Sequence, residues 1–304
     1  MAGLRSSTQS PGRTARLDAL RRKARVALGR FPSSPTTDSP TTNGHSPPPD
    51  DPGALLAWCM EREHVSRPHY LWSVLLAALT ARGLQVAEIS VLELGVAGGN
   101  GLLALEEAAV LTERVLGVQV EVWGFDSGTG MPEPRDRRDV PWAVRPGYFA
   151  MDEPALRGRL SRAQLALGPV ETTVRAWAGA AHPPVGFVAF DLDYYSSTMD
   201  ALCLFDAEDS ALLPRVVCYF DDVLGYGWSE HNGERAAIAN FNALHAQRKI
   251  GYVHGLGHFL PESERTRPWS EQIWMAHLFD HSRYCEFALE LPKEFLDAHR
   301  LGPR

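Results

Sequence analysis

Four aspartates follow two apolar segments of this 304-residue sequence. Asp191 and Asp193 end the segment FVAFDLD, and Asp221 and Asp222 end the segment VVCYFDD. Each segment is typical of a strand that is buried on both faces of a parallel sheet. Unit charges about 4 Å apart repel by about 4 kcal/mol at an effective dielectric constant of about 20, so these carboxylates need a positive partner. They predict a site for a divalent cation or a substrate, or else they cap the helices that follow.

A glycine-rich segment, ELGVAGGNG at residues 93–101, closes another apolar strand and precedes a helix. Glycine lets the backbone turn tightly and approach a ligand. Ligands of open α/β sheets bind beyond the carboxyl ends of the strands. The segment departs from the G-x-G-x-x-G pattern because Ala97 takes one glycine position and Glu93 lies within the strand. It is therefore either a ligand-binding turn or a plain tight connection.

The next strand of the sequence ends in WGFDS at residues 123–127. One carboxylate, here Asp126, can accept hydrogen bonds from both hydroxyls of a ribose. The alternative is that Asp126 is an ordinary turn residue. The glycine-rich segment and Asp126 together predict a ligand that contains a nucleoside.

Strands and helices alternate through most of the chain, which predicts an α/β fold. We expect a Rossmann-like, doubly wound sheet of seven mainly parallel strands with helices on both faces, the last strand being antiparallel. Strands are expected at 89–94, 118–125, 170–176, 186–191, 215–220, 251–255 and 273–279. Helices are expected at about 68–83, 101–115, 153–166, 197–206 and 233–247.

Composition places the chain among ordinary globular proteins, with 44% hydrophobic and 22% charged residues. Residues 1–30 carry eight Lys or Arg and one Asp, a net charge of +7, so the remainder carries −14 of the total of −7. An acidic body argues against nucleic acid as the partner. The four cysteines form no C-x-x-C pair. There is no apolar run of about 18 residues and no signal region, so we expect no transmembrane segment and a cytoplasmic location.

We expect residues 1–51 to be an extension and residues 52–304 to be a single domain with a C-terminal extension. Within the first part, residues 15–31 place Leu17, Leu20 and Leu28 on one face of a basic helix, and a Pro-, Ser- and Thr-rich linker follows. The helix either remains solvated or docks on the acidic body, on a second subunit of a homo-oligomer or on a membrane surface.

Four motifs together resemble one known family. ELGVAGG at 93–99, GFDSGTGMP at 124–132, DLDYYSSTMDAL at 191–202 and FDD at 220–222 are similar to motifs of class I S-adenosylmethionine-dependent methyltransferases, nearest to the macrocin O-methyltransferase branch. The resemblance covers about residues 86–245. Two departures concern the acceptor more than the cofactor: Gly-Thr-Gly follows Ser127 where the branch has Phe-x-Gly, and Leu192 replaces a glycine.

The resemblance implies S-adenosylmethionine as cofactor and magnesium, or another divalent cation, as metal. It places Asp191, Asp221 and Asp222 on the metal, with Asp193 beside them. Trp177, after the expected third strand, would pack on adenine or else belong to the core. The cofactor-binding residues that follow from the resemblance are Glu93, Gly95, Ala97, Gly99, Asp126, Ser127, Trp177 and Asp191.

A hydroxyl acceptor must lose its proton before it attacks a methyl group, and a nearby carboxylate can take that proton. We expect Asp193 and Asp191 to be the catalytic residues, with His231 as a competing base. The segment 131–148 is rich in Pro, Arg and Trp, and long segments of this kind often cover a site. Three aromatic residues lie in or directly after this segment: Trp142, Tyr148 and Phe149. They either cover the acceptor or belong to an ordinary surface loop.

The leading hypothesis is a divalent-metal-dependent O-methyltransferase that acts on a small-molecule hydroxyl, such as that of a sugar or a natural product. A second hypothesis is a nucleotide-sugar glycosyltransferase, because Asp191-Leu-Asp193 fits a D-x-D metal site. A third is a cofactor-binding protein without catalysis, which the altered segment after Ser127 favours.

Overall fold

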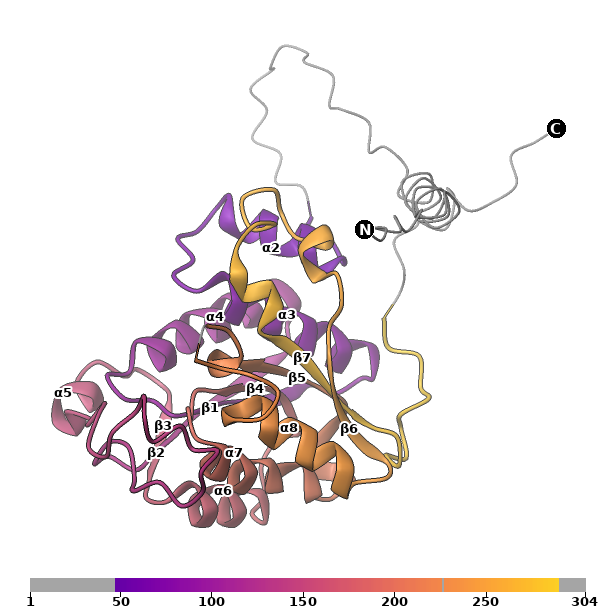
Figure 1. The fold of residues 1–304 in the computed structure, drawn as a ribbon. Coiled ribbons are helices and arrows are strands. Elements are labelled where there is room, and N and C mark those ends of the chain that lie inside the picture. Colours follow the sequence, from indigo (N-terminus) through magenta and orange to yellow (C-terminus); the bar gives the residue numbers. More distant parts are fainter. Residues whose placement is uncertain (1–46, 226, 290–304) are drawn as a thin grey trace, which may run out of the picture. The chain divides into compact units, whose positions relative to one another are not determined.

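The computed structural model describes residues 47–225 and 227–289, which build a seven-stranded sheet between two layers of helices (Figure 1). The predicted basic helix at 15–31 lies outside the described residues. Among the helices within them, none has the length and apolar character needed to cross a bilayer.

The sheet confirms the predicted fold class. Its strand order is β3-β2-β1-β4-β5-β7-β6, and β7 runs antiparallel to the other six strands. The first five strands follow the doubly wound order, in which the chain changes direction across the sheet between β1 and β4. The strands are β1 Glu88–Leu94, β2 Gln119–Asp126, β3 Gln164–Leu167, β4 Val185–Phe190, β5 Leu212–Phe220, β6 Arg248–Tyr252 and β7 Ile273–Leu278.

Helices cover both faces of the sheet (Figure 1). One layer holds α2 Pro52–Met60, α3 Pro68–Gly83 and α4 Asn100–Leu116, and the other holds α6 Val170–Ala178, α7 Tyr195–Ala201 and α8 Gly233–Leu244. A short helix, α5 Glu153–Arg157, precedes β3. The 3-10 helices are η1 Leu202–Asp206, η2 Asp209–Ala211, η3 Asp221–Val223, η4 Leu256–Phe259 and η5 Pro268–Glu271.

Alternate residues of the central strands belong to two separate hydrophobic cores, because successive side chains of a strand point to opposite faces. In β1, Val91 packs in the core under α3 and α4, whereas Leu92 packs in the core with α6, α7 and α8. Burial on both faces explains why these strands are continuous apolar segments in the sequence.

The sequence prediction was wrong around the third strand. The segment expected as a strand at 170–176 is helix α6, and β3 is taken from the segment expected as a helix at 153–166. Val170, Val174 and Trp177 have helical spacing and pack on the second core, and this burial overrides the β-propensity of the Val and Thr residues in the segment.

A buried carboxylate of α4 fixes the chain that leads into β3. Glu106, which is 6% exposed, accepts hydrogen bonds from the backbone N–H groups of Ser161, Arg162 and Ala163 and from the Ser161 hydroxyl. Burial opposes its ionisation, but these hydrogen bonds outweigh burial and hold the pKa of Glu106 below its usual value.

We expect Glu106→Gln to lose about 1–3 kcal/mol of unfolding free energy at pH 7, because an amide cannot accept all these bonds. Since the folded pKa is the lower one, the stabilisation is present above the unfolded pKa of about 4.3 and is lost as pH falls through the folded value. Urea denaturation of the variant and wild type should therefore converge in acid. The control is Glu107→Gln at the exposed neighbouring residue, which should keep wild-type stability. Equal stability of Glu106→Gln and wild type at neutral pH would contradict the prediction.

Candidate functional site

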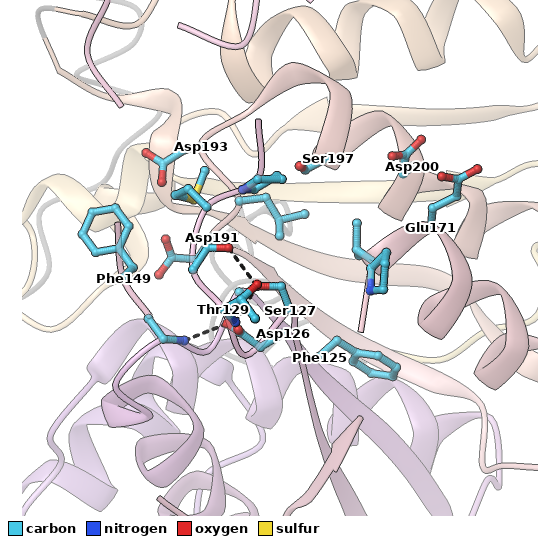
Figure 2. Close-up of a pocket in the computed structure, with 18 of the residues that line it drawn as sticks. Phe125, Asp126, Ser127, Thr129, Phe149, Glu171, Asp191, Asp193, Ser197 and Asp200 are labelled. Atoms are coloured by element: carbon cyan, nitrogen blue, oxygen red, sulfur yellow. Dashed lines mark hydrogen bonds between the residues drawn. The ribbon is translucent and has the colours of Figure 1, made fainter. Parts of the chain in front are cut away.

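A cavity of about 660 Å³ opens at the carboxyl ends of β1, β2, β4 and β5 (Figure 2). It lies at the point where the strand order reverses, which is where ligands of open α/β sheets bind. Its volume falls in the range of small-molecule sites, about 300–1,000 Å³. The candidate site residues that line it are Gly95, Ala97, Asp126, Ser127, Asp191, Asp193, Asp221 and Asp222.

Gly95 allows the end of β1 to meet the end of β4. Its φ of +90° is left-handed, and a Cβ atom there would lie 1.8 Å from the carbonyl oxygen of Asp191. Ala97 also has a positive φ, of +47°, so the turn is tight throughout. Gly99, which precedes α4, packs against Leu156 and is not among the residues that line the cavity. The turn therefore presents Gly95 and Ala97 to the cavity.

Glu93 lies beneath this turn and is 2% exposed. The Tyr70 hydroxyl donates to its Oε1 atom at 2.8 Å, whereas Oε2 is buried without a hydrogen-bond partner among the described residues. A Cβ atom on Gly101 would come within 1.7 Å of Oε1, so that glycine makes room for the carboxylate. Burial raises the pKa of Glu93 to about 8. Glu93 is therefore a buried residue next to the glycine turn and is not part of the cavity lining.

Asp126 joins the end of β2 to the glycine turn. Its Oδ2 atom accepts hydrogen bonds from Val96 N and Ala97 N, both at 2.9 Å, and its Oδ1 atom accepts from Gly128 N at 2.7 Å. A carboxylate has about four acceptor positions, so Asp126 keeps capacity for a ligand hydroxyl beside its structural role. Beside it, the Ser127 hydroxyl donates to the Gly130 carbonyl at 2.8 Å.

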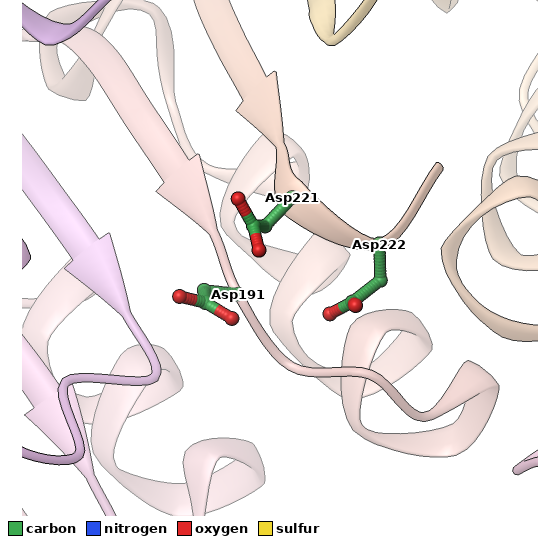
Figure 3. A group of neighbouring side chains, drawn as sticks. All are labelled: Asp191, Asp221 and Asp222. Carbon is green, nitrogen blue, oxygen red and sulfur yellow. The ribbon is translucent and has the colours of Figure 1, made fainter. Parts of the chain in front are cut away.

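Three carboxylates converge at the ends of β4 and β5 (Figure 3). One oxygen from each of Asp191, Asp221 and Asp222 lies within 4.8 Å of the others. The pairing of β4 with β5 aligns Phe190 with Phe220, so the residues that follow them, Asp191 and Asp221, emerge side by side. Two oxygens on opposite sides of an ion lie about 4.2 Å apart for Mg²⁺ and about 5 Å apart for Ca²⁺. The donor set therefore fits a hard divalent cation.

Burial and like charges raise the pKa values of the carboxyl groups in this cluster. Burial, then the charges of Asp221 and Asp193, raise the pKa of Asp191 to about 7. Burial also raises the pKa values of Asp193 and Asp222, and the Asp193 charge adds to the effect on Asp222. Such shifts are typical of carboxylates that share a site and that a cation would neutralise.

Neighbouring groups hold the cluster, and sequence inspection missed two of them, Tyr219 and Glu234. The Tyr219 hydroxyl donates to Asp221 Oδ1 at 2.5 Å, and Asp193 N donates to Asp222 Oδ2 at 3.0 Å. Glu234, fully buried in the first turn of α8, accepts from Asp222 N and Leu192 N. In the sequence, an acid at the start of a helix is expected in any case because it complements the helix dipole, so Glu234 gave no distinguishing signal.

The segment 131–149 forms one wall of the cavity and ends at Phe149, which lines it and is 58% exposed. Asp139 fixes this segment: it is fully buried and accepts hydrogen bonds from Arg135 N and Asp136 N and from both the N–H and the hydroxyl of Ser196. Ser196 lies in α7, which follows the acidic turn after β4. The segment and that turn are therefore held as one unit.

The expectation that Trp177 packs on adenine rested on the wrong third strand. Trp177 lies in α6 within the core, stacks on His182 at a ring distance of 3.7 Å, and is not among the residues that line the cavity. His231 is exposed and also lies outside the lining. The cavity lining also includes Arg135 of the segment 131–149, which pairs with Asp200 and Glu171.

No protein-family model matches the chain, and no curated protein matches it. Among solved structures it is similar to the O-methyltransferase NovP, with 18% identity over 58% of this chain and 72% of that chain and a TM-score of 0.43. It is also similar to CalS11, a calicheamicin methyltransferase (21% identity, 80% and 91% coverage, TM-score 0.43), and to the Podospora anserina methyltransferase PaMTH1 (15%, 90% and 99%, 0.39). Identities and TM-scores this low carry no information about activity.

Alanine substitutions at two of the three glycines of the turn, Gly95 and Gly98, should differ in their effect on stability. Gly95→Ala should lose at least about 1–3 kcal/mol of unfolding free energy, because alanine is strained at this φ and its Cβ overlaps the Asp191 carbonyl. Gly98→Ala should stay within about 0.5 kcal/mol of wild type, because nothing lies within 4 Å of a Cβ there. Urea denaturation of both variants measures the difference. Equal stability of the two would contradict the close approach of β1 and β4.

Proposed function

We propose that this chain is an S-adenosylmethionine-dependent O-methyltransferase that acts on a small-molecule hydroxyl with the help of a divalent cation. The observation that carries the proposal is the meeting of three sequence features in one cavity. The glycine turn after β1, Asp126 after β2 and the carboxylates after β4 and β5 all lie at the switch point of the sheet. These are the features on which the resemblance to the methyltransferase family rests.

In this proposal, the first two strands bind the methyl donor. Asp126 would accept hydrogen bonds from the ribose hydroxyls, and Ser127 lies next to it in the cavity lining. Gly95 and Ala97 line the cavity and leave space for the methionine part, because neither carries a large side chain. Gly99 and Glu93 would act indirectly, by setting the path of the turn.

Asp191, Asp221 and Asp222 would hold the divalent cation, since their oxygens already converge. When bound, such an ion would lower the pKa of an acceptor hydroxyl and orient it. The protein's own contribution is alignment, for which effective molarities of about 10⁵–10⁸ M show the scale.

Methyl transfer forms a bond between the acceptor oxygen and the methyl carbon as the bond from that carbon to sulfur breaks. The acceptor hydroxyl must first lose its proton. Asp193 lines the cavity beside the metal ligands, where its carboxylate can accept the proton of a bound hydroxyl. We assign proton removal to Asp193.

The geometry favours this proposal over the two alternatives. A D-x-D site would place Asp191 and Asp193 on one ion, but the oxygens that converge belong to Asp191, Asp221 and Asp222. A cofactor-binding protein without catalysis has no need of a carboxylate cluster beside the donor site. The acceptor is proposed to be the hydroxyl of a sugar or another natural product, next to Phe149.

S-adenosylhomocysteine should stabilise the wild-type protein by about 2.7 kcal/mol at about 100 times its dissociation constant. Asp126→Ala should bind it much more weakly, because the ribose loses its acceptor. Calorimetric titration separates this effect from any loss of stability. Asp152→Ala is the control, since Asp152 also accepts a backbone N–H but lies outside the cavity lining. Equal affinity of the Asp126 and Asp152 variants would remove Asp126 from the donor site.

Asp193→Asn should lower kcat by about 10²–10⁴-fold, the usual contribution of a general base. S-adenosylhomocysteine affinity should be unchanged, because the donor is bound by the first two strands. The measurement is S-adenosylhomocysteine production with an acceptor found by screening sugar and catechol hydroxyls. His231→Asn should keep wild-type kcat, and the reverse pattern would assign the base to His231.

A further inference from the structure

Glu234 connects the acidic turn after β4 to the acidic turn after β5. It is the second residue of α8 and is 0% exposed. Its Oε2 atom accepts from Asp222 N at 3.0 Å, and its Oε1 atom accepts from Leu192 N at 3.3 Å. Leu192 lies between Asp191 and Asp193 in the turn after β4, and Asp222 belongs to the turn after β5. A single side chain thus bridges both groups of candidate metal ligands.

The two turns need such a bridge. Both lie beyond the strands, so the N–H groups of Leu192 and Asp222 have no partner in the sheet. The three carboxylates repel one another, and charges about 4 Å apart cost about 4 kcal/mol at an effective dielectric constant of about 20. The separation of 4.8 Å or less among their oxygens must therefore be maintained by other groups.

Few side chains could replace Glu234 here. A carboxylate offers two acceptor oxygens and no donor, which matches two N–H groups that point at it. Glutamine would direct its NH₂ group at one of them. Aspartate would keep the two acceptor oxygens but is shorter by one carbon–carbon bond, about 1.5 Å, and could not reach both.

We propose that Glu234 is a positioning residue that sets the spacing of Asp191, Asp221 and Asp222 for a divalent cation. It does not belong to the converging oxygens itself, because its own oxygens are engaged with the two turns. This inference rests on the metal part of the proposed function.

The test is calorimetric titration of the full-length chain with Mg²⁺ alone. Loss of a group that orients metal ligands typically weakens metal affinity by about 10–100-fold, and we expect this for Glu234→Gln. Glu106→Gln is the matched control, because Glu106 is also a buried carboxylate that accepts backbone N–H groups but is not among the residues that line the cavity. It should lose stability and keep wild-type Mg²⁺ affinity.

Glu234→Asp keeps both acceptor oxygens but changes their position, and it also serves if Glu234→Gln does not fold. Weakened Mg²⁺ binding in Glu234→Asp supports positioning, whereas wild-type affinity in that variant overturns the inference. Wild-type Mg²⁺ affinity in Glu234→Gln, together with reduced stability like that of Glu106→Gln, overturns it as well.

Titration with S-adenosylhomocysteine in the same samples distinguishes this inference from the proposed function. A wild-type protein that binds S-adenosylhomocysteine but no Mg²⁺ overturns the role of Glu234 and leaves the methyl donor in place. A wild-type protein that binds Mg²⁺ but no S-adenosylhomocysteine removes the donor, and the Glu234 variants still decide the inference.

Discussion

The end of β4 is held between the ends of β1 and β5, and this arrangement determines where every candidate group lies. Asp191 N donates to the Leu94 carbonyl at 2.9 Å, so β1 and β4 stay in contact up to their last residues. Gly95 lets the chain leave β1 beside the Asp191 carbonyl, where a Cβ atom would lie at 1.8 Å. On the other side, Asp193 N donates to Asp222. The cavity exists because three chain segments diverge from these contacts.

The same arrangement brings buried carboxylates close together, which is unfavourable unless other groups compensate. The Tyr219 hydroxyl donates to Asp221 and offsets part of the repulsion, and the hydrogen bonds to Glu234 hold the two turns in place. What remains is visible in the raised pKa of Asp191, about 7. A preorganised cluster with residual repulsion is suited to bind a cation, because the positive charge would relieve the repulsion.

The acceptor side of the cavity depends on a different contact. Asp139 holds the segment 131–149 to the start of α7, and α7 follows directly from the turn that carries Asp191 and Asp193. Arg138 adds to this contact, since its guanidinium lies 3.5 Å from the centre of the Tyr195 ring. The wall that would face an acceptor is therefore coupled to the carboxylates that would activate it.

Local patterns in the sequence determined the fold class, the positions of β1, β2, β4 and β5, and the acidic residues that follow them. Buried parallel strands are continuous apolar segments, and parallel strands place their carboxyl ends at one edge, so both inferences need only short segments. Tertiary structure alone decided that 170–176 is a helix, that Trp177 belongs to the core, and that Glu234 and Asp139 hold the site. These depend on burial against distant residues and on hydrogen bonds across 12–57 positions of the chain. No local pattern contains that information, because a polar side chain at the start of a helix or in a loop looks the same in the sequence whether it meets solvent or a buried backbone N–H.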